Sequence, residues 1–141
     1  MTEFSRELLN EKLAQCAQAL TDLRRYKEVG TLEYLRTHPD IYYAVCYRFI
    51  SVIESLLDAG QIVLASRGVR AVNEGEIAAL LAREKMIPQD LATRCASMYG
   101  FRNRLVHAYG TLDDAKVAEY LADHLRDVEE LLAIFQNVFE K

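Results

Sequence analysis

Hydrophobic residues recur along the chain in steps of three and four, the period of an amphipathic helix. The first series comprises Leu9, Leu13, Cys16, Leu20 and Leu23. It predicts a first helix that ends at Val29-Gly30, with cationic side chains in its last turn, where they suit the helix dipole. A short helical turn over 31–36 should follow. It should end before His38, because His38 precedes a proline and therefore avoids the α region.

A second long helix is expected from about Pro39 to Arg67, with Gly68 ending it. Its main apolar face comprises Ile41, Val45, Phe49, Val52, Leu56 and Val63. Its far side is also apolar at Ile53, Leu57 and Leu64. A helix that is apolar on two sides is central to the fold or lies at a subunit contact. Although residues 62–64 could locally form a strand, no second strand is evident to pair with them, so we expect helix.

Two further helices are expected between residues 73 and 108. Asn73 followed by Glu76 resembles an N-terminal cap with its reciprocal partner, which predicts a short third helix to about Lys85. Pro88 suits the first turn of a fourth helix. That helix should run to Ala108.

The C-terminal part predicts one last helix. Gly110 is a candidate cap for the helix before it, and Asp113 for the start of the new one. The apolar positions of this helix are Val117, Leu121, Leu125, Val128, Leu132, Phe135 and Phe139. The expected fold is therefore all-α: one domain, residues 1–141, formed by a bundle of four long or medium helices plus short helices.

Composition narrows the classes of protein that fit. About half of the 141 residues are apolar, which favours a packed globule, and no apolar run reaches the length of a membrane span. No signal peptide is visible, so we expect a cytoplasmic protein without membrane association. Three scattered cysteines argue against a disulfide framework and are expected in the core, and three histidines share no metal-ligand spacing. A net charge of −4 argues against a long non-specific nucleic-acid groove, but allows a local phosphate site.

One local cluster of polar residues stands out at the end of the fourth helix. The stretch 100–109 contains Arg102, Asn103, Arg104, His107 and Tyr109 within two helical turns. Asn103 and His107 are four residues apart and so share a face, over which the long side chain of Arg102 can reach. An apolar line buries the neighbouring face (Leu91, Cys95, Met98, Leu105). The cluster is therefore expected on a rigid, half-buried element.

These residue types suit cleavage of a phosphodiester. Histidine can act as a base or an acid near neutral pH, and arginine contacts phosphate with a permanent charge. The chemistry needs neither a metal nor a cofactor. Because one histidine cannot readily be both base and acid, a two-fold homodimer across this helix would supply the second. A structural interpretation stays open: the helix dipole favours a histidine near a C-terminus, and an Arg–Asn pair can satisfy backbone groups.

Other polar and aromatic residues leave alternatives open. Asp58 can orient His107 or pair with Arg102, or it can simply face solvent. Three tyrosines can stack on bases or, more commonly, pack in a core or an interface (Tyr42, Tyr43, Tyr47). The acidic run of the last helix is typical of a solvated face, or less often of a docking surface (Asp123, Asp127, Glu129, Glu130). His38 and His124 are expected to have no functional role.

The motif resembles a known family signature. Arg102-Asn103-x-Leu105-Val106-His107-x-Tyr109 is similar to that of HEPN domains, an arginine and a histidine separated by four residues here. The closing tyrosine and the upstream pattern from Ile87-Pro88 to Phe101 narrow the resemblance to HepT-like toxins, over nearly the whole chain. One departure is Ile62, where many relatives carry a histidine, and it weighs against a catalytic role for polar residues of the second helix.

This resemblance implies a function. The protein would be the toxin of a type VII-like toxin–antitoxin pair, a homodimeric, metal-independent endoribonuclease that cleaves tRNA or mRNA. Arg102 and His107 would be catalytic, supported by Asn103, Arg104 and Asp58. The antitoxin would be a minimal nucleotidyltransferase that transfers AMP to Tyr109. The alternative is a non-catalytic HEPN module that binds a nucleotide or a nucleotidyltransferase partner.

Overall fold

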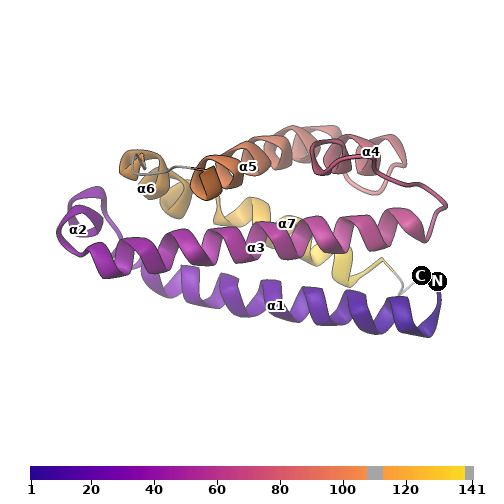
Figure 1. Cartoon of the computed structure of the whole chain (residues 1–141), viewed down its shortest axis with the longest axis horizontal. Helices are drawn as coiled ribbons and strands as arrows, with labels where there is room; N and C mark the ends of the chain where they lie inside the picture. The colour runs from indigo at the N-terminus through magenta and orange to yellow at the C-terminus, as the bar shows by residue number, and fades with distance from the viewer. Residues whose placement is uncertain (108–112, 139–141) are drawn as a thin grey trace.

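The computed structural model describes residues 1–107 and 113–138, and every regular element within them is helical (Figure 1). The elements are α1 (Glu3–Lys27), α2 (Leu32–Thr37), α3 (Pro39–Ala65), the 3-10 turn η1 (Glu74–Glu76), α4 (Ile77–Arg83), α5 (Gln89–His107), α6 (Asp114–Asp123) and α7 (Leu125–Gln136). The predicted all-α class is confirmed. None of these helices is long and apolar enough to cross a membrane.

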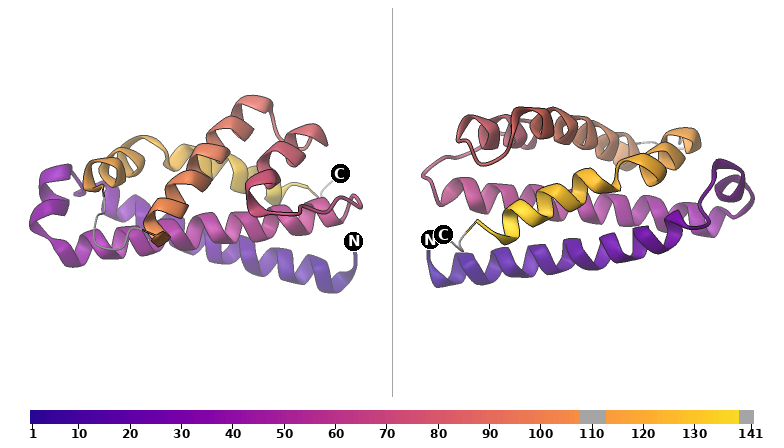
Figure 2. Two further views of the ribbon diagram at one scale, coloured as in Figure 1. Left: turned by 45° about the horizontal axis from the view of Figure 1, so that its top comes forward. Right: turned by 180° about the vertical axis from the view of Figure 1, so that it is seen from behind.

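The long helices α1 and α3 lie side by side over most of their length and form the base of the bundle (Figures 1 and 2). All five residues of the first apolar series are buried in the core. In α3, both apolar sides contribute to the core, as Phe49 and Ile53 illustrate. The prediction that α3 is central, and that it stays helical over 62–64, is therefore confirmed.

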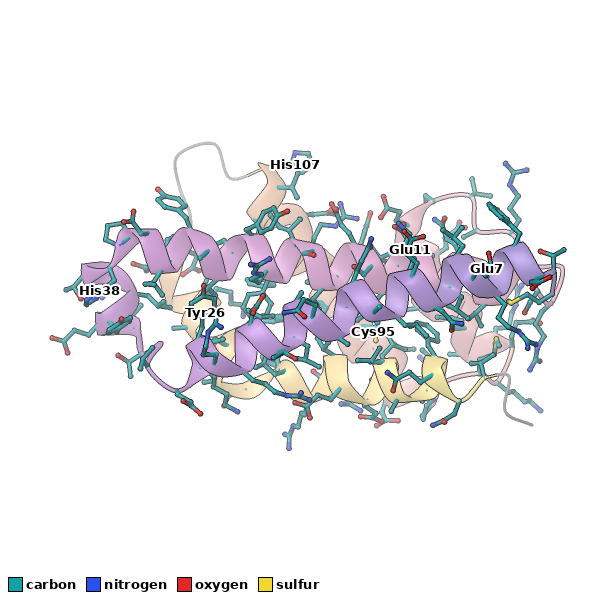
Figure 3. The ribbon with its side chains drawn as sticks, turned by 90° about the horizontal axis from the view of Figure 1, so that it is seen from below. Glu7, Glu11, Tyr26, His38, Cys95 and His107 are labelled. Carbon is teal, nitrogen blue, oxygen red and sulfur yellow. The ribbon has the colours of Figure 1, made fainter. Side chains whose placement is uncertain are left out.

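The second half of the chain covers this base. Helix α7 packs against α1 and α3, whereas α5 packs against α3 and α4 (Figure 2). The short helix α2 contacts α6 at the opposite end of the bundle from η1 and α4. As a result, α5 is held from below by α3 and from its flanks by α4 and α7, while its C-terminal end projects beyond them (Figure 3).

The helix ends follow the sequence signals in most cases. The residues after α3 include Gly68 with φ of 72°, a left-handed backbone that favours glycine, and the amide of Val69 closes the end on the Leu64 carbonyl at 3.0 Å. The predicted cap at Asn73 is wrong in its detail, because the Asn73 side chain makes no capping hydrogen bond. Instead, the Glu76 carboxylate accepts from the Val72 amide at 3.1 Å, and the turn that follows is 3-10.

The single last helix expected from the sequence is wrong, because the structure breaks it at His124. Asp113 caps α6 as expected, its carboxylate accepting from the amide of Lys116. At His124 the backbone leaves helical geometry, with φ −116° and ψ 3°, and α7 begins at Leu125. The break goes with a change in the main packing partner: α6 packs most extensively on α2, whereas α7 packs most extensively on α1 and α3. Phe139, which we placed in this helix, lies outside the described residues.

Candidate active site on helix α5

The predicted polar cluster lies on a firmly anchored helix. On its core side, α5 buries Leu91, Met98 and Phe101. The Phe101 ring stacks on Tyr120 of α6 at 4.0 Å between centroids and meets the edge of Phe49 of α3 at 5.2 Å. Aromatic contacts on two sides fix the helix immediately before Arg102. As expected, the described part of the motif lies on a half-buried helix and not on a loop.

Arg102 is the buried member of the cluster, with 8% of its surface exposed. Its Nη2 donates to Glu74 Oε2 of η1 at 2.5 Å, and its guanidinium carbon lies 5.2 Å from the centroid of the Tyr99 ring. Its Nε is buried without a hydrogen-bond partner in the described part of the chain. Arg102 therefore reaches toward η1 and contacts the Glu74 carboxylate there.

The other motif residues in the described range are more open. His107 is exposed at the end of α5, and its ring points away from the bundle (Figure 3). Arg104 is also exposed, and Asn103 is half-buried. The last turn of α5 thus presents one imidazole and one guanidinium to solvent. Tyr109, the expected site of AMP transfer, lies outside the described residues.

Asp58 is placed away from Arg102. Its carboxylate forms an ion pair with Lys12 of α1 at 3.2 Å, and half of its side chain is exposed. The carboxylate that binds Arg102 is that of Glu74. The structure therefore places Asp58 in a surface contact between α3 and α1, and a supporting role for it in the site stays a prediction.

The contact with Glu74 escaped the sequence analysis. Glu74 precedes Arg102 by 28 residues and belongs to a short connection with no helical period. The cap pattern drew attention to its neighbours Asn73 and Glu76, but nothing in the pattern distinguishes one carboxylate of that turn from the other. Only the fold shows that Glu74 is the one that meets the motif.

A second charged cluster ties α5 to α7. Arg94 donates to the buried carboxylate of Asp127, to Glu130 at 3.3 Å and to Asp90 at 3.1 Å. His124 Nδ1 lies 3.3 Å from the same Asp127 carboxylate, and its ring packs at 4.3 Å from that of Tyr120. The solvated face expected for this acidic run is therefore wrong at Asp127, which is 3% exposed because it neutralises Arg94 at a helix–helix contact.

The tyrosines of α3 and the cysteines divide by burial. Tyr42 is in the core, whereas Tyr43 and Tyr47 are exposed. All three cysteines are free thiols, and Cys16 and Cys46 belong to the core as expected. Burial raises the pKa of Cys16 and of Cys95 to about 12 and that of Cys46 to about 11, which disfavours a nucleophilic thiolate. In residues 1–107 and 113–138, no group of three acidic, histidine or cysteine side chains could hold a metal ion.

Comparison with known proteins agrees with this architecture. A tri-AMPylated HEPN toxin of Shewanella oneidensis, solved in complex with an MNT antitoxin, superposes with a TM-score of 0.84 at 19% identity, over 96% of this chain and 98% of that one. A toxin–antitoxin structure with AMP-PNP gives 0.84 at 18% identity, over 92% and 98% of the two chains. YutE of Bacillus subtilis, described as a cytosolic protein of unknown function, gives 0.75 at 15% identity, over 93% and 90%.

Comparison of the sequence with curated proteins and with family models identifies the family of this chain. No curated protein sequence matches the chain. A family model described as "Ribonuclease HepT-like" matches residues 16–134, which include α3, α5 and the whole Arg102–His107 segment. This match covers most of the chain, and it agrees with the helical architecture and with the position of the motif on α5. The protein therefore belongs to the HepT-like ribonuclease family.

Proposed function

We propose that this protein is the toxin of a toxin–antitoxin pair and acts as a metal-independent endoribonuclease. The observation that supports this most directly is the position of the motif. In a chain of the HepT-like ribonuclease family, Arg102 and His107 both belong to the C-terminal part of α5. A guanidinium and an imidazole on one rigid helix are the groups that this cleavage requires.

The proposed reaction assigns a role to each group. His107 removes the proton of the ribose 2′-hydroxyl, whose oxygen attacks the adjacent phosphorus. The bond to the 5′-oxygen breaks, and an acid protonates this leaving group, which gives a 2′,3′-cyclic phosphate and a 5′-hydroxyl end. Arg102 stabilises the charge on the phosphorane, Asn103 orients the reacting groups, and Arg104 contacts the RNA backbone.

A homodimer supplies the second catalytic group in this proposal. Each chain offers one motif histidine, and a two-fold axis beside α5 brings a second copy to the same cleft. Large apolar side chains are exposed on α3 and α5, namely Tyr43, Tyr47 and Val106, and such side chains are typical of a surface that another chain covers. The Glu74–Arg102 contact would line the same cleft.

We further propose that a minimal nucleotidyltransferase antitoxin transfers AMP to Tyr109. Support comes from the structural neighbour described as a tri-AMPylated HEPN toxin bound to an MNT antitoxin. Tyr109 follows His107 by two residues, so an attached phosphodiester would be drawn to Arg104 and Arg102, the cations assigned here to RNA. The modified chain would carry a tethered competitor of its own substrate.

The deciding experiment is incubation of the pure protein with total RNA in EDTA, with His107→Ala and Arg102→Ala in parallel. The wild type should cut RNA and leave 2′,3′-cyclic phosphate ends, whereas both variants should stay folded and lose cleavage. Asn103→Ala should be intermediate, because it orients and does not transfer a proton. Cleavage that persists after removal of the 2′-hydroxyl at the cut site would refute the route, and a folded wild type without activity would favour a non-catalytic HEPN module.

A further inference from the structure

The Glu74–Arg102 contact joins a turn to the helix that carries the motif. Glu74 lies on η1, whereas Arg102 lies on α5, and their side chains meet at 2.5 Å. The arginine side chain is 10% exposed, while that of Glu74 is 47% exposed. The guanidinium is therefore enclosed by the protein, and the carboxylate reaches it from the surface.

A second contact holds the same guanidinium. The Tyr99 ring, one helical turn earlier on α5, lies 5.2 Å from the guanidinium carbon, within the range of a cation–π contact. The carboxylate and the ring come from two different elements. Both contacts favour the side-chain arrangement that the structure shows.

The turn itself is fitted closely against this pair. A Cβ at Gly75 would lie 3.4 Å from Tyr99 Cε1, an ordinary van der Waals distance, and 3.3 Å from Asn73 Oδ1. The η1 backbone therefore lies close to the Tyr99 ring. Glu76, two residues after Glu74, serves a different purpose, because its carboxylate accepts from the amide of Val72. Of the two carboxylates on η1, one closes the local backbone and the other is directed at the motif arginine.

We propose that Glu74 is a positioning residue for catalysis: it fixes the guanidinium of Arg102 in the orientation that receives the phosphate. This inference rests on the ribonuclease function proposed above. Glu74 need not touch the RNA, since it acts through Arg102.

The physical basis is preorganisation. A free arginine side chain loses rotamer entropy when it is immobilised, and a pre-existing carboxylate contact removes that cost from the transition state. An arginine has five N–H donors, so a bond through Nη2 leaves others for phosphate oxygens. The carboxylate also supports the charge of a side chain that is otherwise mostly buried.

The test is a kinetic comparison on a fluorophore–quencher RNA oligonucleotide that contains a mapped cut site, in EDTA. Glu74→Ala should lower kcat on the order of ten- to hundredfold while KM changes by no more than about twofold, because orientation is lost but most RNA contacts remain. Glu74→Asp, which keeps the charge with a shorter reach, should recover part of kcat. If Glu74 had a purely structural role, Glu74→Ala would lower the urea midpoint of unfolding without lowering kcat selectively over KM.

Glu76→Gln is the matched control, since it removes one negative charge from the same turn and keeps an oxygen for the Val72 amide. It should leave kcat and KM near the wild-type values. Equal effects of Glu74→Gln and Glu76→Gln would show that only the local charge matters. A faster Glu74→Ala enzyme would show that the carboxylate competes with phosphate. Either result would overturn the positioning role.

A readout that does not depend on cleavage keeps the inference separate from the proposed function. Phenylglyoxal modifies accessible, mobile arginines, and peptide mass spectrometry reports the rate at Arg102. Arg102 should react slowly in the wild type and several-fold faster in Glu74→Ala, while Glu76→Gln matches the wild type. Equal rates in all three would show that Glu74 does not hold the guanidinium. If the wild type cuts no RNA, the ribonuclease proposal and the catalytic role of Glu74 both fail, and this measurement then decides only whether the contact holds Arg102.

Discussion

Two arginines of α5 illustrate how individual residues organise this molecule. Arg94, near the start of the helix, binds Asp127 of α7, and Arg102, near its end, binds Glu74 of η1. In the first pair the carboxylate is buried and the arginine is the more open partner, whereas in the second the arginine is buried. The first arrangement suits a structural cross-link, and the second keeps a cation enclosed within the motif.

We predict that Asp127→Asn lowers the free energy of unfolding by about 2 kcal/mol, the scale of a buried hydrogen bond to a charged group. The substitution keeps the shape of the side chain, but it removes the charge that neutralises Arg94 and faces His124. Urea unfolding followed by circular dichroism measures the loss. Asp90→Asn is the matched control, because Asp90 binds the same arginine with 78% of its side chain exposed, and it should change the stability little. Equal stability of Asp127→Asn and wild type would contradict a stabilising role.

For individual residues, the sequence predicts which side chains are candidates for catalysis better than it predicts which side chains contact one another. The pairing of arginine and histidine types within one short segment identifies Arg102 and His107 as candidates. It does not show that Arg102 turns toward η1 or that Asp58 pairs with Lys12, because those partners are set by how helices distant in sequence pack together. Asp127 shows the same limit, since its acidic neighbours suggest a solvated face until α5 is placed beside it.

Among the elements, α5 contains an interior glycine directly before the motif. Apart from its own helical turn, a Cβ at Gly100 would meet no atom within 4 Å in the part of the chain that the structure describes. We therefore predict that Gly100→Ala stabilises the protein by about 0.5–1 kcal/mol, because alanine loses less backbone freedom in a helix.

Gly60→Ala is the matched comparison on α3. There the added Cβ would lie 2.8 Å from Ile77 Cγ2, so the contact between α3 and α4 must shift and stability should fall. Urea midpoints of the two variants should move in opposite directions. A loss of stability in Gly100→Ala would contradict an open helix face at that position.

The helices themselves were largely predictable, because the apolar period of each is read from neighbouring residues. The same signal could not reveal the break at His124, since the apolar positions keep their spacing through it. The break between α6 and α7 goes with a change in the main packing partner, from α2 to α1 and α3, and that depends on the whole bundle.

For the whole molecule, we predict a two-fold dimer at micromolar concentration, measurable by multi-angle light scattering. Val106→Glu should shift the protein toward monomer and reduce cleavage, because it places a charge on an exposed apolar position of α5 within the motif, next to His107. Val29→Glu is the control, since Val29 is also exposed but lies in the turn after α1. A fully active monomer would contradict the shared cleft.

The antitoxin prediction also belongs to the assembled molecule. Co-expression with the nucleotidyltransferase should add one or more AMP units to Tyr109 and abolish cleavage, as detected by intact-mass spectrometry and peptide mapping. Tyr109→Phe should keep the ribonuclease activity and escape inactivation, because only the hydroxyl is lost. A mass increment on another residue, with Tyr109 unmodified, would defeat this prediction.

The contact between Glu74 and Arg102 has a consequence for how such genes are interpreted across genomes. Under the proposed function, a lineage could silence such a toxin by a change in η1 alone, leaving the arginine and histidine of the motif intact. Surveys that count the motif would then score a degenerate gene as an active one. In an alignment of relatives, the identity of the residue at position 74 should therefore vary together with the presence of the motif arginine and with the presence of an adjacent antitoxin gene.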